Sequence, residues 1–285
     1  MIETIGTLLA NGTQQLATQC GEKTAFIEAR VLLRHIVDDA DDATLIRKEN
    51  NEVTATVREA FEHNVQRRLT GEPVAYIVGN CEFMGLDFIT TPAALVPRPE
   101  TEEMTEAALL HLPEDTGRVL DMGAGCGAIG LSIAHLKKQI HVLLADTSED
   151  TLALAQKNAH HLGVNNAQFH HGNWFSQMGN ERFDLIVSNP PYVAANDEVL
   201  ATLRYEPILA LVGGNDGLDG LRQVIVGAPQ HLTAGGVLMV EHGAQQATAV
   251  RMLFASAGFC GVCCCNDLAG LPRITFAVRG GGHIL

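Results

Sequence analysis

The chain has 285 residues, of which 46% are hydrophobic and only 18% are charged, so it is long enough and apolar enough to bury a large core. Its 19 Lys and Arg against 33 Asp and Glu give a formal net charge of −14, which disfavours binding to nucleic acid or to acidic lipid. No stretch reaches the roughly 18 apolar residues of a membrane span. The first residues lack a basic start followed by an apolar stretch, and we therefore expect a cytoplasmic protein.

The first 73 residues have the spacing of amphipathic helices. Two apolar stripes run through them, one of Phe26, Ala29, Leu33 and Val37, and one of Val53, Val57, Phe61, Val65 and Leu69. Gly71 ends the last helix, and Pro73 prevents its continuation. These observations predict a small helical domain over residues 1–73.

Residues 74–96 contain two short apolar pieces, AYIVG and CEFMGLDFI. Gly85 divides the second piece, as expected for the turn of a hairpin. We therefore predict extended structure here and a hairpin linker over 74–96 that joins two domains. Helix is expected again after Pro97 and Pro99.

From residue 118 onward, the sequence alternates strand, turn and helix. The predicted strands are RVLDM, IHVLLAD, FDLIVSN, GGVLMVEHG and RITFAV. Several of them are continuous apolar runs, which are typical of strands covered by helices on both faces. The pattern predicts an α/β domain over residues 97–285, built on a doubly wound, Rossmann-like parallel sheet.

Seven cysteines suit a reducing compartment, because an odd number cannot form a complete disulfide framework. Four of them crowd together at Cys260, Cys263, Cys264 and Cys265. A zinc site is the alternative here, but no second pair of ligands completes it. We predict no metal, and a strand over GFCGVCCCN in which cysteine acts as a small hydrophobic residue.

The first candidate site follows the strand RVLDM and opens a helix. It consists of Gly123, Ala124, Gly125, Cys126 and Gly127. Glycines let the backbone turn sharply and approach a ligand closely, with helix N–H groups facing it. Together with Gly130 the loop also matches GxGxxG, so a nicotinamide dinucleotide and a purely structural turn remain alternatives.

The next predicted strand ends at Asp146. An acidic side chain at this place can accept hydrogen bonds from both ribose hydroxyls of an adenosine cofactor. The alternative is an acid that caps the helix after Thr147 and Ser148.

The segment Ser188-Asn189-Pro190-Pro191-Tyr192 follows the strand FDLIVS, at the carboxyl edge where open α/β sheets bind their ligands. A residue before proline is held extended, so Asn189 and Pro190 are stiff. The Asn189 side-chain oxygen and the Pro190 carbonyl can accept the two hydrogens of a planar NH₂ group, with Tyr192 as an aromatic wall. Holding both hydrogens favours a pyramidal nitrogen aligned for attack on a methyl donor, without a metal or a strong base.

The stretches DMGAGCGAIG, VSNPPYV and CEFMGLDFITTPAALVPRPETE resemble the PrmC/HemK family of protein-(glutamine-N(5)) methyltransferases. GNWFS, YEPILALVGGNDGLDGLR, VEHG and DLAGLPRI follow in the family's order, so the resemblance covers nearly the whole chain. It implies a class I S-adenosyl-L-methionine-dependent methyltransferase domain behind N-terminal helices that dock the substrate. The implied reaction methylates the side-chain amide nitrogen of the glutamine in the Gly-Gly-Gln motif of peptide chain release factors, with S-adenosyl-L-homocysteine as product.

The resemblance also implies roles for individual residues. The cofactor is lined by Gly123, Ala124, Gly125, Cys126, Gly127 and Asn189, held at its ribose by Asp146, and flanked at its adenine by Asn173 and Trp174. The substrate amide is gripped by Asn189, Pro190, Pro191 and Tyr192, of which Asn189, Pro190 and Tyr192 are catalytic. The family usually has aspartate where this chain has Asn173, so the hydrogen bond to the adenine amino group comes from a neutral oxygen and is weaker.

Arg98 and Glu100 in the PRPETE segment are candidates to brace the mouth of the pocket, although Glu100 can equally be an exposed acid at a helix N-terminus. We expect a monomer with release factors as its partners, and no nucleic acid or membrane.

Other functions use the same motifs. The main alternative is an adenine exocyclic-amine methyltransferase acting on DNA or RNA, because NPPY suits any planar NH₂, but the chain lacks a basic run for phosphates. A nicotinamide-dependent oxidoreductase would need a Tyr-x-x-x-Lys pair or its equivalent, which we do not find. A non-catalytic binder would not need Asn189 and Tyr192.

Overall fold

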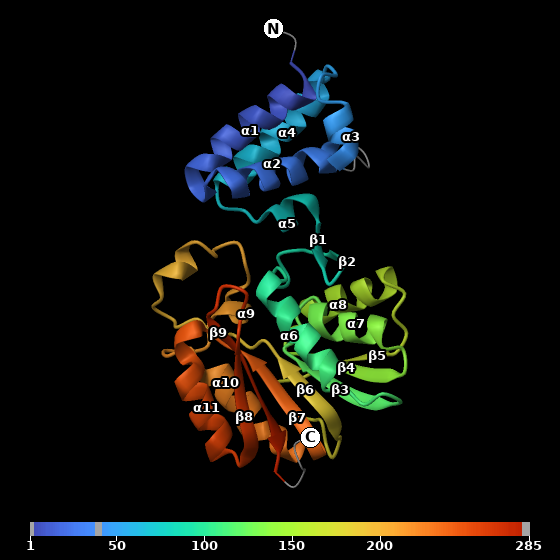
Figure 1. Cartoon of the computed structure of the whole chain (residues 1–285), viewed down its shortest axis with the longest axis vertical. Coiled ribbons are helices and arrows are strands. Elements are labelled where there is room, and N and C mark those ends of the chain that lie inside the picture. Colours follow the sequence, from blue (N-terminus) through green and yellow to red (C-terminus); the bar gives the residue numbers. More distant parts are fainter. Residues whose placement is uncertain (1–2, 38–41, 281–285) are drawn as a thin grey trace. The chain divides into compact units, whose positions relative to one another are not determined.

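The computed structural model describes residues 3–37 and 42–280 (Figure 1). It divides into two compact units, Met1–Asn80 and Cys81–Leu285. No helix within the described ranges is both long and apolar enough to cross a membrane.

The first unit is helical, as predicted. It contains α1 (Ile5–Cys20), α2 (Glu22–Ile36), α3 (Asp42–Arg47), α4 (Ala55–Leu69) and α5 (Val74–Val78). Thr4 begins α1 with a capping box, because its hydroxyl accepts from the backbone N–H of Thr7 and the Thr7 hydroxyl accepts in return. Ala29 and Leu33 of the first predicted stripe, and Phe61 and Val65 of the second, are buried in one core.

Phe26, predicted to lie on the apolar stripe of the first helical domain, is not buried. Phe26 is 45% exposed, and the Arg30 guanidinium lies over its ring at 5.6 Å. The buried face of α2 includes Ala25, Ala29 and Leu32, and Phe26 lies at its edge because each residue turns the helix by about 100°.

The piece AYIV, predicted to be extended, is helical. Pro73 lies just before α5, where its fixed φ suits a helix start, and Gly79 ends the helix in the left-handed conformation with φ 82°. Ile77 packs into the core of the helical unit. After α5 the chain forms a two-stranded sheet of β1 (Asn80–Phe83) and β2 (Leu86–Ile89), with Gly85 in the turn.

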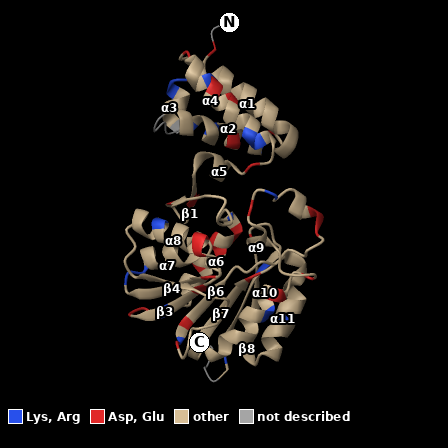
Figure 2. Cartoon of the chain, turned by 180° about the vertical axis from the view of Figure 1, so that it is seen from behind, with Lys and Arg blue, Asp and Glu red and all other residues tan. Residues whose placement is uncertain are grey.

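The second unit contains the predicted α/β sheet. Its seven strands lie in the order β5-β4-β3-β6-β7-β9-β8 (Figures 1 and 2). They are β3 (Gly117–Met122), β4 (Ile140–Asp146), β5 (Ala167–His171), β6 (Phe183–Ser188), β7 (Leu232–Glu241), β8 (Phe259–Asn266) and β9 (Pro272–Arg279). The first five strands in that order pair in parallel, and β9 runs antiparallel to both of its neighbours. The doubly wound fold is confirmed, as a mostly parallel sheet.

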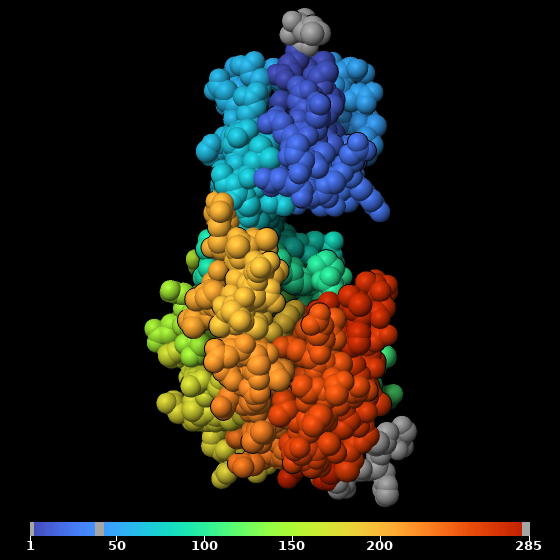
Figure 3. Space-filling view, turned by 90° about the vertical axis from the view of Figure 1, so that its left-hand side faces the viewer, coloured from blue at the N-terminus to red at the C-terminus, as the bar shows by residue number. Residues whose placement is uncertain are grey.

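Helices cover both faces of this sheet. They are α6 (Pro99–Leu110), α7 (Ala128–Leu136), α8 (Glu149–His161), α10 (Asp219–Gly227) and α11 (Ala247–Ser256). The unit also contains the short helix α9 (Ile208–Leu211) and the 3₁₀ turns η1 (Glu198–Ala201), η2 (Ala228–Gln230) and η3 (Ala244–Gln246). Successive strand residues enter different cores: Val119 joins one cluster and Leu120 the other. This explains why the strands are continuously apolar. α10 contacts α11, and in Figure 3 the orange surface of the segment after β6 borders the orange-red to red surface of the C-terminal elements.

The cysteine-rich segment forms β8, as expected, but its cysteines are not small core residues. Cys260, Cys263 and Cys265 are exposed and Cys264 is half-buried. β8 is the edge strand of the sheet, and α11 packs against it, with Phe259 and Val262 in the apolar cluster. The edge position leaves three of the four cysteines exposed. All seven cysteines are free.

Candidate active site

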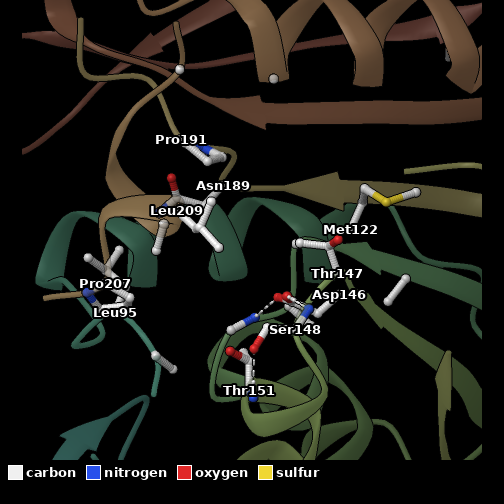
Figure 4. Close-up of a pocket in the computed structure, with 18 of the residues that line it drawn as sticks. Leu95, Met122, Asp146, Thr147, Ser148, Thr151, Asn189, Pro191, Pro207 and Leu209 are labelled. Atoms are coloured by element: carbon white, nitrogen blue, oxygen red, sulfur yellow. Dashed lines mark hydrogen bonds between the residues drawn. The ribbon is translucent and has the colours of Figure 1, made fainter. Parts of the chain in front are cut away.

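A cavity of about 590 Å³ lies at the carboxyl ends of the parallel strands (Figure 4). All of the residues that line it fall between Ala93 and Gln223, within the α/β unit. In Figure 4, Asp146 with Ser148 and Thr151 lies on one side of the cavity, and Asn189 with Leu209 on the other. Its volume is within the range of about 300–1,000 Å³ that is typical of small-molecule sites.

The glycine loop connects β3 to α7. Gly123 and Gly125 have φ of 75° and 58°, the left-handed region that favours glycine, and a Cβ added at either would meet nothing within 4 Å. The backbone here is therefore open to a ligand. Gly123, Ala124, Gly125 and Cys126 line the cavity.

Gly127 has a different role from its neighbours. It is not among the lining residues, and a Cβ there would lie 2.7 Å from the Leu131 side chain. Gly130 similarly lets its N–H donate to the buried Asp121 carboxylate at 2.8 Å. These two glycines bring α7 close to the sheet, which is a packing role.

Asp146 lies at the end of β4 and lines the cavity. Its two carboxylate oxygens accept from the backbone N–H groups of Gly125 and Ser148, each at 3.0 Å. Burial raises the pKa of Asp146, while these N–H groups act in the opposite direction. Each oxygen has a second lone pair, so the carboxylate can still accept ribose hydroxyls. The N-cap of α8 is Ser148, whose hydroxyl accepts from Thr151 N–H.

Asn173 and Trp174 follow β5 and both line the cavity. Asn173 is exposed, and its backbone N–H donates to the Ser176 hydroxyl at 3.0 Å. Trp174 has a positive φ of 50° and also packs against the core between the sheet and α10. The indole is thus part of both the core and the cavity wall.

The NPPY segment leaves β6 beside the glycine loop. Asn189 and Pro191 line the cavity, whereas Pro190 is buried behind it and Tyr192 is not among the lining residues. The Tyr192 hydroxyl instead donates to buried Glu241 at 3.2 Å, and burial together with this carboxylate raises the pKa of Tyr192. Tyr192, predicted as an aromatic wall, is thus held by its hydroxyl on Glu241 and is not one of the residues that line the cavity.

The stretch YEPILALVGGNDG holds the NPPY backbone in place. Val193 N–H donates to Leu211 and Gly213 N–H donates to Val193, both at 2.9 Å. A Cβ at Gly213 would lie 2.3 Å from the Pro191 carbonyl oxygen, so only glycine allows this approach. The Gln246 side chain adds a hydrogen bond to the Tyr192 carbonyl at 3.0 Å.

A buried ion pair joins two segments at the cavity. Glu206 accepts from Val96 N–H at 3.1 Å and pairs with Arg98 at 2.5 Å, with side-chain exposures of 2% for Glu206 and 33% for Arg98. Arg98 lines the cavity, in agreement with its predicted position, but Glu100 is exposed on the first turn of α6 and does not.

Sequence reasoning missed Thr101, Glu206, Glu241 and Gln246. Each lies in or beside a stretch that carries the family resemblance, but its partner is distant in the chain. Glu206, for example, bonds Val96 over 110 residues, and Thr101 bonds Glu241 over 140. The sequence offered one signal for these residues, because an acid within an otherwise apolar stretch, such as Glu241 in LMVEHG, indicates a buried acid that needs a partner.

Comparison with solved structures identifies the fold. A methyltransferase from Pyrococcus furiosus has a TM-score of 0.54 at 19% identity, covering 77% of this chain and 99% of that chain. The T. thermophilus 16S rRNA N2 G1207 methyltransferase, solved with AdoMet and guanosine, has a TM-score of 0.52 at 20% identity, covering 70% of this chain and 49% of that one. Residues 88–205 match the family model described as methyltransferase small domain. The fold is that of an S-adenosylmethionine-dependent methyltransferase.

Closer relatives identify the family. Residues 7–79 match the model of the PrmC N-terminal domain. Proteins named release factor glutamine methyltransferase are 45% identical in Neisseria gonorrhoeae, over 87% of this chain and 92% of theirs, and 37% identical in Escherichia coli, over 87% and 90%. This chain belongs to the release factor glutamine methyltransferase family.

Proposed function

We propose that this protein transfers a methyl group from S-adenosyl-L-methionine to the side-chain amide nitrogen of the glutamine in the Gly-Gly-Gln motif of peptide chain release factors. The observation that carries the proposal is the Asn189 carboxamide at the cavity edge. Its NH₂ donates to Thr101 at 3.2 Å, which leaves its oxygen as an acceptor for a planar amide. The names of the relatives support the choice of substrate.

The cavity fits the adenosyl cofactor in shape and chemistry. The open backbone at Gly123 and Gly125 leaves room for its methionine part, the Asp146 carboxylate can hold the ribose, and Trp174 offers an aromatic face to adenine. When bound, S-adenosyl-L-methionine supplies a methyl group activated by a sulfonium. Asn173 can accept from the adenine amino group only through a neutral oxygen.

The chain's own groups make the substrate nitrogen reactive. An amide nitrogen is a poor nucleophile because its lone pair is delocalised. The Asn189 oxygen, at the cavity, and the carbonyl of the next residue, the buried Pro190, accept its two hydrogens in this proposal, which favours pyramidal geometry and directs the lone pair toward the methyl donor. Once methylated, the nitrogen carries an extra proton that is acidic enough to pass to water, so no protein base is required.

The proposal also includes the partner protein, the oligomeric state and the metal requirement. The helical domain docks the release factor, the enzyme works as a cytoplasmic monomer, and no metal takes part. Methylation of adenine in nucleic acid fits less well, because the first turn of α6, next to the cavity-lining Arg98, carries Glu100 and Glu102 rather than basic residues.

The test offers labelled S-adenosyl-L-methionine with a purified release factor, or with DNA or RNA. We expect label only on the release factor, and mass spectrometry should find one added methyl on the Gly-Gly-Gln glutamine. Asn189→Ala should abolish most turnover while cofactor affinity changes little. Label on nucleic acid alone, or normal turnover by Asn189→Ala, would contradict the proposal.

A further inference from the structure

A hydrogen-bonded network lies directly behind the Asn189 carboxamide. Thr101, on the first turn of α6, is 4% exposed, and Glu241, at the end of β7, is 1% exposed. The Asn189 NH₂ donates to the Thr101 hydroxyl at 3.2 Å, and that hydroxyl donates to one Glu241 oxygen at 2.7 Å. The other Glu241 oxygen accepts from the Tyr192 hydroxyl at 3.2 Å.

The direction of these bonds follows from the chemistry of the groups. In its ionised form the Glu241 carboxylate can only accept, and the Thr101 hydroxyl then gives its single proton to Glu241. The hydroxyl can then act toward Asn189 only as an acceptor. The NH₂ end of the Asn189 carboxamide must therefore face Thr101, and its oxygen must face the other way.

We propose that Thr101 and Glu241 are positioning residues of this enzyme, which set the orientation of the Asn189 carboxamide so that its oxygen faces the substrate. The inference rests on the proposed function, because it assumes that Asn189 accepts from a glutamine NH₂. If the carboxamide were turned over, it would present donors to a substrate group that also donates, and the amide would not be held for attack.

The carboxylate form of Glu241 is needed for this arrangement. Burial raises the pKa of Glu241 above its ordinary value, whereas the Thr101 and Tyr192 hydroxyls lower it. The charged groups that act on it are Arg273 on β9, which lowers its pKa, and Glu100 on α6, which raises it. As the pH falls, Glu241 takes up a proton and can donate to Thr101, so the orientation of Asn189 is no longer enforced. Turnover should fall on the acid side at a higher pH than an ordinary glutamate would give.

The decisive variants are Thr101→Val, which keeps the shape of the side chain without its hydroxyl, and Thr101→Ser, which keeps the hydroxyl. We expect Thr101→Val to lower kcat on a release factor by about 10- to 100-fold, as for the loss of one or two hydrogen bonds. Thr101→Ser should restore most of kcat. Cofactor affinity, measured by calorimetry, should stay within about twofold in both, because the hydroxyl of the cavity-lining Thr101 gives its single proton to Glu241 and valine keeps the shape of the side chain.

Thr105→Val is the matched control. Thr105 is buried one turn along α6, and its hydroxyl bonds only the backbone of Thr101, at 3.1 Å. The same substitution there should leave kcat within about twofold. If Thr105→Val lowered kcat as much as Thr101→Val, the loss of any buried hydroxyl in α6 would impair the enzyme, and the inference would be overturned.

A second variant keeps the inference testable if Thr101→Val does not fold. Glu241→Gln cannot titrate, so it should have a lower kcat and no acid limb from this group in its pH profile. An acid limb that stays at the wild-type pH in Glu241→Gln would overturn the inference, as would wild-type kcat in Thr101→Val. The proposed function fails separately, when the wild-type enzyme does not methylate a release factor at all.

Discussion

Removal of one partner of the ion pair between Arg98 and Glu206 should destabilise the α/β unit more than removal of one partner of an exposed pair. Glu206→Gln removes the charge that compensates Arg98 and weakens the acceptor for Val96 N–H. Removing one partner of a fully buried pair costs about 3–5 kcal/mol. Because the Arg98 side chain is 33% exposed and water can partly replace its partner, we expect a loss of about 2–3 kcal/mol in unfolding free energy.

The matched control is Glu181→Gln. Glu181 pairs with Arg118, and both side chains are 45% exposed, so this variant should lose no more than about 1 kcal/mol. Urea unfolding can be followed by the fluorescence of Trp174, the single tryptophan of the chain, which packs in the core of the same unit. Equal losses in the two variants would refute the argument from burial.

Three further outcomes can be measured. Burial raises the pKa of Asp121 to about 7, so its ionisation destabilises the folded state as the pH rises. Between pH 5 and pH 8 the wild type should lose about 2–3 kcal/mol more unfolding free energy than Asp121→Asn. Parallel curves of unfolding free energy against pH for the two proteins would contradict this. Gly213→Ala should lower kcat by about 100-fold by displacing the Pro191 carbonyl, and unchanged kcat would show that the loop adapts. Asn173→Asp should tighten cofactor binding by about fivefold in calorimetry, because the acceptor becomes charged, whereas weaker binding would place adenine elsewhere.

The sequence predicted the central strands because their apolar runs are bounded by clear turns. IHVLLAD corresponds to β4 residue for residue. β5 was not predicted, since AQFHH has little apolar character and is placed by pairing with β4. The helical state of α5 was missed because five residues are too few to show a period, and contact with the helical core decides their conformation.

For the candidate site, local motifs were informative where one short segment carries the geometry. Gly123, Gly125, Asp146 and Asn189 all line the cavity, as the motifs predicted. The support behind them was not predictable, because it depends on partners brought together by the sheet order. Tyr192 illustrates the limit: its motif indicated a ring facing the ligand, but the bond to Glu241 determines where its hydroxyl lies.

The residues that line the cavity fall between Ala93 and Gln223 of the α/β unit, which therefore carries the proposed reaction centre. If the helices select the release factor as proposed, exchanging them for those of a relative should redirect the enzyme to another client protein without rebuilding the reaction centre. Such chimaeras offer a route to glutamine methylation in sequences chosen by design.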